Sequence, residues 1–291
     1  MLARVAGIFL PVFSVIALGW LYALRAKPDL AWVNRINVTV LAPALIFSAL
    51  ASKDFDIGAN APLIAGVVGV VAGSGLVAWP LARLLREDPR TWVPPMMFNN
   101  CGNMGLPLAY LSYGAPGLSA MVMMFTTSNL LHFTLGIRIL DRRAAFWPAL
   151  ANPMVVATFL GFAFAVAHPP MPDWLTLAIK MVGDASIPLM LISLGVRLAG
   201  ARSDALRTGM AGSIVRPVSG IVAAAAVAPF LGLDPVQHGL LLLFGCLPPA
   251  VLNFMLAEQY NQEPGKVASI VLVGNMMSVI FVPLGLALAL R

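Results

Sequence analysis

Asparagine, glycine and proline gather at two points of this sequence where the flanking residues are apolar enough for a continuous helix. The residues concerned are Asn99, Asn100, Gly102, Asn103 and Pro107 in the first segment and Pro248, Pro249 and Asn253 in the second. Proline in a helix interior removes a backbone donor and clashes with the preceding turn, at about 3 kcal/mol or more, and glycine also disfavours helix. We therefore predict a broken helix in each segment. A helix that restarts after a break presents free N–H groups and a positive dipole end, and asparagine adds neutral donors, so such a site suits a carboxylate.

The elements that carry these segments are apolar throughout. The chain has 291 residues, of which 60% are hydrophobic and 10% charged, whereas soluble domains carry about 25% charged residues. A helix needs about 20 residues to cross a bilayer, so the apolar stretches predict an all-α membrane protein of about ten spans. Their approximate limits are 5–24, 31–52, 62–84, 92–112, 116–140, 153–168, 174–197, 208–231, 237–257 and 267–290, with Gly114 and Pro116 dividing the fourth from the fifth.

Both predicted breaks fall inside spans, in the fourth and the ninth. Broken backbone cannot face lipid, because its unbonded amide and carbonyl groups would each cost several kcal/mol there. We therefore expect both breaks in the protein interior, where they line a shared cavity near the middle of the bilayer.

The basic residues predict the orientation. Of the 18 Lys and Arg residues, most lie in the loops after the odd-numbered spans, and basic loops accumulate on the cytoplasmic side. This places both termini outside a cell inner (plasma) membrane. Loops facing an anionic leaflet account for the net charge of +6, so no nucleic-acid partner is implied.

The two halves of the chain resemble each other in organisation. An offset of 145 residues places Pro43 over Pro188 and Cys101 over Cys246. Five spans precede the basic loop near Arg142 and five follow it, so the second half starts on the opposite side of the membrane, as in inverted repeats. The predicted repeats are residues 1–146 and 147–291, and spans four and nine, which carry the breaks, occupy equivalent positions in them.

Ionisable residues within spans are functional candidates and normally have a partner. Asp184 in span seven and Arg216 in span eight are both expected near mid-depth, where they could form an ion pair, and Lys180 lies one turn from Asp184. Asp184 could exchange a proton or a sodium ion, or the charges could form a static pair. Other polar residues could hold a cation: Ser48, Ser193, Ser128, Asn129 and Asn275. They are weaker candidates, because most serines in membrane helices bond their own helix or a neighbour. His132 is expected to pack.

Other chemistry finds little support. The two cysteines, Cys101 and Cys246, have no acidic or histidine neighbours at ligand spacing, so neither a metal site nor a cofactor is predicted beyond a coupling H⁺ or Na⁺. A phosphate-cradling loop is missing, as are the serine, histidine and aspartate patterns of intramembrane proteases. We therefore expect no enzyme.

At the broken segments the chain resembles the auxin efflux carrier family, which includes bacterial malonate and malate permeases. The run from Asn100 to Pro107 is similar to the family's Asn-x-Gly-Asn-x-Gly-Leu-Pro signature, and Pro248 with the segment 253–260 resembles its second crossing helix. The resemblance implies two inverted five-helix repeats, with a scaffold bundle and a transport bundle in which the broken helices of spans four and nine cross. It also implies organic anions as cargo. It carries over Asn100, Asn103, Pro107, Pro248 and Asn253 as site residues. The long central loop of the plant carriers is absent, which favours a compact carboxylate carrier over an auxin carrier.

The sequence thus favours a secondary transporter that moves a small mono- or dicarboxylate across the lipid bilayer by alternating access. One alternative is a cation/proton antiporter, which would normally place carboxylates at the crossing. Another is an anion sensor built on a carrier fold. The direction of transport and the exact cargo are not encoded in any of these features, and a homodimer is left open.

Overall fold

The computed structural model describes residues 1–52, 55–143, 151–200 and 205–290, and these are almost entirely helical. In the first half the elements are α1 (Leu2–Ala26), α2 (Ala31–Ile36), the π-helical turn η1 (Asn37–Leu41), α3 (Ala42–Leu50), α4 (Ile57–Leu84), α5 (Pro89–Met97), the π-helical turn η2 (Cys101–Gly105), α6 (Leu106–Leu131), the π-helical turn η3 (His132–Gly136) and α7 (Ile137–Leu140). In the second half they are α9 (Pro153–Ala167), α10 (Asp173–Asp184), α11 (Ser186–Gly200), α12 (Leu206–Val227), the 3-10 turn η4 (Ala228–Phe230), α13 (Pro235–Cys246), α14 (Val251–Gln259) and α15 (Pro264–Ala289).

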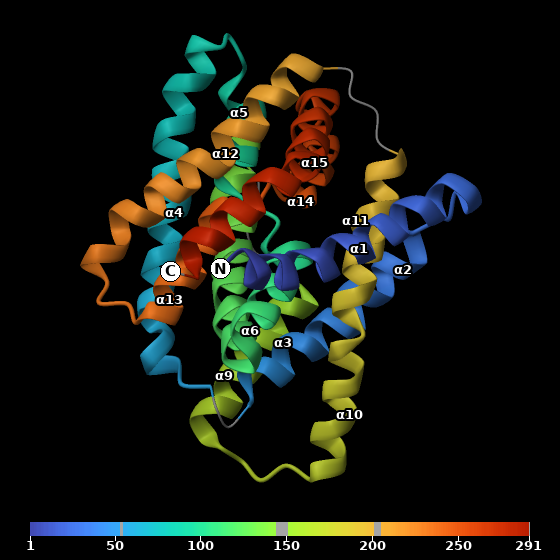
Figure 1. Cartoon of the computed structure of the whole chain (residues 1–291), viewed down its shortest axis with the longest axis vertical. Coiled ribbons are helices and arrows are strands. Elements are labelled where there is room, and N and C mark those ends of the chain that lie inside the picture. Colours follow the sequence, from blue (N-terminus) through green and yellow to red (C-terminus); the bar gives the residue numbers. More distant parts are fainter. Residues whose placement is uncertain (53–54, 144–150, 201–204, 291) are drawn as a thin grey trace.

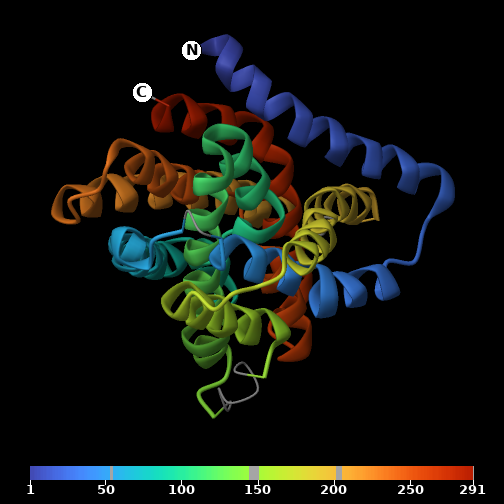
Figure 2. The ribbon, with the colours of Figure 1, turned by 90° about the horizontal axis from the view of Figure 1, so that it is seen from below.

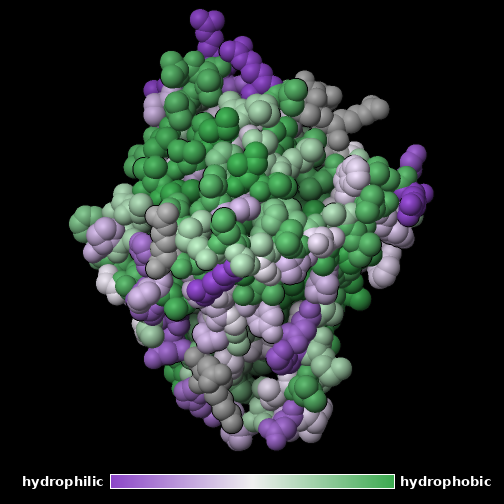
Figure 3. Space-filling view, in the orientation of Figure 1, coloured by the Kyte–Doolittle hydropathy of each residue, from purple (hydrophilic) through white to green (hydrophobic). Residues whose placement is uncertain are grey.

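Seven helical stretches of the described chain are long and apolar enough to cross a membrane, and the apolar helices α9 and α13 are shorter. One stretch, residues 101–140, is 40 residues long, about twice the length a bilayer needs. Gly114 interrupts it with φ +69° and ψ −155°, a conformation that glycine adopts readily. The predicted break at Gly114 is therefore confirmed. Hydrophobic residues also cover much of the molecular surface that Figure 3 shows, above all in its upper half.

The helices form two groups by their contacts; in Figures 1 and 2, α4, α12 and α13 lie on the left and α1, α10 and α11 on the right. In one group α12 packs on α4, α13 and α15, and α4 packs on α5. In the other, α1 packs along α11, and α3 packs on α9 and α10. The first group contains both broken helices, so the packing surrounds the breaks with protein, as expected.

Spans two and seven are interrupted as well, which the sequence analysis does not predict. Span two passes through the π-helical turn η1, and span seven changes from α10 to α11 at Ala185. At this point the two spans touch backbone to backbone, because a Cβ on Gly183 would lie only 2.7 Å from Leu45 Cα. Glycine is required there for the close approach.

Candidate functional site

The two broken helices meet where each is interrupted. α5 ends at Met97 and α13 ends at Cys246, and the short segments that follow are extended before η2 and α14 begin. The segments pair as an isolated antiparallel bridge. Asn100 N donates to Pro248 O at 2.7 Å, and Ala250 N donates to Phe98 O at 3.0 Å. We call residues 98–100 and 247–250, with the helix ends that flank them, the crossing. The predicted breaks are confirmed.

Asparagine side chains complete the hydrogen bonding of the crossing. Asn99 Nδ2 donates to Phe244 O at 2.6 Å, and Asn253 Nδ2 donates to Phe98 O at 3.0 Å, so each half supplies an amide to a carbonyl of the other. Asn100 Nδ2 donates to Asn275 Oδ1 at 2.8 Å. All four asparagines are buried. A buried carbonyl without a partner costs about 1–3 kcal/mol, so these bonds hold the broken backbone together.

This arrangement changes what the asparagines can offer a ligand. Asn99, Asn100 and Asn253 use amide protons within the crossing, while Gly102 and Asn103 are partly exposed at its edge. Phe125 lies against Gly102, where a Cβ would come within 2.9 Å of its ring. In this conformation the accessible donors of the crossing are therefore at the start of η2 and on Asn103.

The predicted prolines lie in different settings. Pro248 and Pro249 belong to the extended segment between α13 and α14, where Pro248 O accepts from the other half. Pro107 lies in the first turn of α6, after the break, and is buried. Proline is well tolerated in a first helical turn. Only the first two prolines therefore interrupt the backbone.

His132 packs on the crossing, as predicted. Its ring stacks on Phe98, with centroids 4.1 Å apart and planes 8° from parallel. A cavity of about 10 Å³ beside His132 and Asn253 is about the size of one water. The sequence analysis does not link His132 to the break, because the two are far apart in the chain.

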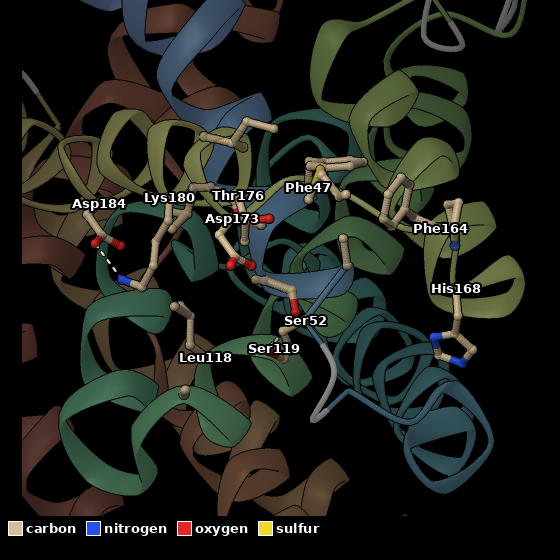
Figure 4. Close-up of a pocket in the computed structure, with 18 of the residues that line it drawn as sticks. Phe47, Ser52, Leu118, Ser119, Phe164, His168, Asp173, Thr176, Lys180 and Asp184 are labelled. Carbon is tan, nitrogen blue, oxygen red and sulfur yellow. Dashed lines mark hydrogen bonds and ion pairs between the residues drawn. The ribbon is translucent and has the colours of Figure 1, made fainter.

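A larger cavity of about 830 Å³ lies between α3, α6, α9 and α10. Its walls include Ser48, Ser119, Thr176 and the edge-to-face pair Phe47 and Phe164. Figure 4 shows the polar side chains entering from several of these helices. The cavity is bordered by the turns near residues 51–52, 115 and 168–173, which lie on the side opposite the basic loops. It is a large, partly polar chamber, of the size that small molecules occupy.

The predicted ion pair between Asp184 and Arg216 is wrong. Asp184 pairs instead with Lys180, whose Nζ lies 2.6 Å from its carboxylate, and both line the large cavity (Figure 4). The two lie four residues apart on α10, a spacing that brings side chains together. α10 packs on α3 and α11, whereas α12, which carries Arg216, packs on α4, α13 and α15. Similar depth in the membrane therefore did not mean proximity.

The weaker polar candidates are dispersed. Ser48 donates to Leu45 O of its own helix and lines the large cavity. Ser193 in α11 and Ser128 in α6 are buried, and Asn129 is partly exposed. They form no single cluster with Asp184, and a cation-holding role for them stays a prediction.

A polar cluster that the sequence analysis did not single out joins the two halves on the side of the basic loops. We call it the loop cluster. Lys266 Nζ lies 2.9 Å from Glu87 and 2.8 Å from Glu263, and Thr91 donates to Glu263 at 2.6 Å. Gln262 donates to Asp88 at 3.0 Å. Sequence reasoning could not find this cluster, because most of its bonds join residues more than 170 positions apart.

Hydrogen bonding in the loop cluster shifts two carboxyl groups. Bonds from Lys266 and Thr91 hold the pKa of Glu263 below its usual value. Partial burial acts to raise the pKa of Asp88, but hydrogen bonds from Arg90 and Gln262 outweigh it and lower that pKa. Both carboxylates are thus favoured in the charged form that the cluster requires.

Known proteins are similar to this chain in sequence over nearly its whole length. The model of the family described as "Membrane transport protein" matches twice, over residues 5–147 and 142–286. A protein of Rhizobium meliloti named "Putative malonate transporter" is 25% identical over 309 residues, covering 96% of this chain and 93% of the relative. An "Uncharacterized transporter" of Methanothermobacter thermautotrophicus is 25% identical over 94% of this chain and 95% of the relative.

A plant relative matches a smaller part. "Auxin efflux carrier component 6" of Arabidopsis thaliana is 25% identical over 139 residues, which is 44% of this chain and 24% of the relative. The family model, in contrast, covers nearly the whole chain in its two matches. The chain therefore belongs to the membrane transport protein family, the family of the auxin efflux carriers.

Proposed function

We propose that this protein is a secondary transporter that moves a small organic anion, a mono- or dicarboxylate, by alternating access around the crossing. The observation that carries the proposal is the pairing of the two broken helices, which brings the starts of η2 and α14 to one place. Helix starts attract anions through free N–H groups and the helix dipole. Malonate, which appears in the name of a full-length relative, is such an anion.

The proposed architecture is ten membrane helices in two inverted repeats, residues 1–146 and 147–291, whose boundary lies outside the described residues. The packing supports it, because the contact of α1 with α11 has a counterpart in that of α9 with α3. At the offset of 145 residues these are equivalent pairs of spans. The double match of the family model fits the same division.

In this architecture both termini lie outside the inner membrane and the basic loops face the cytoplasm. The large cavity then opens outward, and the structure corresponds to an outward-facing state. α3, α9 and α10 would belong to a static scaffold, against which the group around the crossing moves. The loop cluster, formed between α4, α5, α12 and α15, would keep that group rigid.

Charge in the cavity suggests a route for coupling. The cavity wall has one basic side chain, Lys180, and two acidic side chains, Asp173 and Asp184. Its net charge is therefore not positive, and the wall does not attract anions by itself. We propose that Lys180 leaves Asp184 for the carboxylate of the cargo, and that Asp184 is the residue through which transport is coupled to protons. An exposed ion pair is weak, at about 0–1 kcal/mol, so the exchange is energetically accessible.

The test is flux into liposomes that contain the purified protein, with labelled malonate, malate and a series of other carboxylates under imposed proton gradients. We expect saturable uptake of at least one carboxylate, enhanced by a proton gradient in the wild type but not in Asp184→Asn. Asp173→Asn is the matched control and should keep the enhancement. Binding without flux would support a sensor instead, and cation exchange without any anion would support an antiporter.

A further inference from the structure

Arg216 is a buried charge at the crossing that the proposed function does not use. Its side chain is 0% exposed, and its Nη1 donates to Gly245 O at 3.4 Å, in the last turn of α13. The helix that carries it, α12, packs on both broken helices, α5 and α13. Arg216 therefore lies where the two broken helices meet.

Among the residues that the structure describes, the guanidinium forms no ion pair. No carboxylate of the described residues lies within 4 Å of it, and its Nε and Nη2 have no hydrogen-bond partner. Arginine stays protonated in proteins, so the charge cannot be removed by loss of a proton. A buried, unpaired charge is strongly unfavourable, and its presence here needs a compensating interaction.

The carbonyl end of α13 supplies part of that compensation. The end of a helix carries a partial negative charge on its unbonded carbonyls. Phe244 O accepts from Asn99, and Gly245 O accepts from Arg216. Of these two donors to the carbonyl end of α13, Asn99 is neutral and Arg216 is charged.

The other broken helix lacks an equivalent charge. At the offset of 145 residues, the position that corresponds to Arg216 is Val71, a buried aliphatic residue of α4. After α5, Phe98 O accepts from Ala250 N and Asn253, which are neutral donors. The crossing thus has one fixed positive charge on one side only, which internal symmetry does not require.

In transporters with broken helices, carbonyl ends of half-helices at the midplane coordinate the coupling cation. We propose that the Arg216 guanidinium is a tethered cation that takes the place of a coupling metal ion such as Na⁺ at the α13 end of the crossing. The anionic cargo then binds and moves without Na⁺, because the required positive charge is part of the chain. This inference rests on the proposed function.

Two measurements test it. The first is carboxylate flux into proteoliposomes with all Na⁺ replaced by choline. The second is the melting temperature of the detergent-purified protein during titration with guanidinium, sodium or choline chloride at constant ionic strength. We expect wild-type flux and melting temperature to be the same in Na⁺ and choline. Arg216→Ala should lose flux on the order of tenfold or more, and low-millimolar guanidinium should restore part of its flux and raise its melting temperature.

Arg197→Ala is the matched control, because Arg197 is a partly buried arginine in the last turn of α11, which is not one of the broken helices. Its melting temperature should not respond specifically to guanidinium. If Arg216→Ala does not fold, Arg216→Lys should keep Na⁺-independent flux and Arg216→Met should lose it.

Three results would overturn the inference: wild-type flux that requires Na⁺, full flux in Arg216→Ala without added cation, or an equal guanidinium response in both alanine variants. The melting measurement needs no cargo. It therefore separates failure of this inference from failure of the proposed function, which would appear as absence of wild-type flux for every carboxylate.

Discussion

Asn275 in α15 should be essential for holding the crossing together. Its Nδ2 donates to Pro249 O at 3.0 Å and to Val271 O at 2.8 Å, and its Oδ1 accepts from Asn100 Nδ2 at 2.8 Å. One buried side chain thereby binds both broken segments. Asn275→Leu keeps a similar side-chain volume and removes all three bonds.

The expected loss follows from the groups left unpaired. Val271 O lies within α15 and keeps its helical hydrogen bond, so loss of the bond from Asn275 Nδ2 to this carbonyl adds little. Asn100 Nδ2 and Pro249 O are buried, and each unpaired group costs about 1–3 kcal/mol. Because the added apolar surface of leucine offsets about 1 kcal/mol, we expect Asn275→Leu to destabilise the protein by about 3 kcal/mol, the middle of a range of about 1–5 kcal/mol.

Thermal unfolding of the detergent-purified protein measures this loss. At roughly 2–4 °C per kcal/mol for chains of comparable size, the melting temperature should fall by roughly 5–15 °C. Met276→Leu is the matched control, since Met276 is the next residue of α15 and is 58% exposed. Its melting temperature should stay within about 2 °C of the wild type.

A double-mutant cycle tests the reasoning itself. Once Asn100→Leu has removed the amide, Asn275→Leu no longer leaves that donor unpaired, so the double variant should be more stable than the sum of the single losses by about 1 kcal/mol or more. Strict additivity, or no loss in Asn275→Leu, would refute the account of the crossing as a hydrogen-bonded unit.

Two further predictions concern packing and pH. Gly195→Ala should destabilise the protein by about 1–3 kcal/mol, because a Cβ there would meet the backbone of α1 at Ile16 and Trp20; Gly7→Ala, which meets nothing within 4 Å, should change the melting temperature little. Stability should also fall in acid. Because the pKa values of Asp88 and Glu263 are lowered on folding, their contribution is complete above their ordinary values of 3.8 and 4.5 and is lost as the pH drops through the lowered values. A melting temperature that changes no more between pH 5 and 3 in the wild type than in a combined Asp88→Asn and Glu263→Gln variant would exclude this contribution.

The sequence predicts the breaks well because their causes are local. Pro248 and Pro249 cannot continue a helix, and the asparagines and glycines after Phe98 weaken it. The same local logic predicts the bend at Gly114, where the structure has a positive φ. The burial of the breaks follows from the absence of water in lipid.

Partners across the chain could not be predicted in the same way. The bond between Asn100 and Asn275 spans 175 residues, and no periodicity reports on it. The expected pairing of Asp184 with Arg216 used depth alone, but depth does not say which helices touch. The interruption between α10 and α11 has no proline or glycine at Ala185 itself, and the contact of Gly183 with Leu45 that accompanies it is visible only in three dimensions.

Access to the crossing from both sides of the membrane, controlled by the cargo, is the central claim. The most direct measurement is labelling of Asn103→Cys by a membrane-impermeant maleimide, in oriented vesicles, from the outside and from the inside. The native cysteines are each only 1% exposed and should react little. We predict labelling from both sides, slowed by malonate or another transported carboxylate. Labelling from one side only, or labelling that no transported anion slows, would contradict the account.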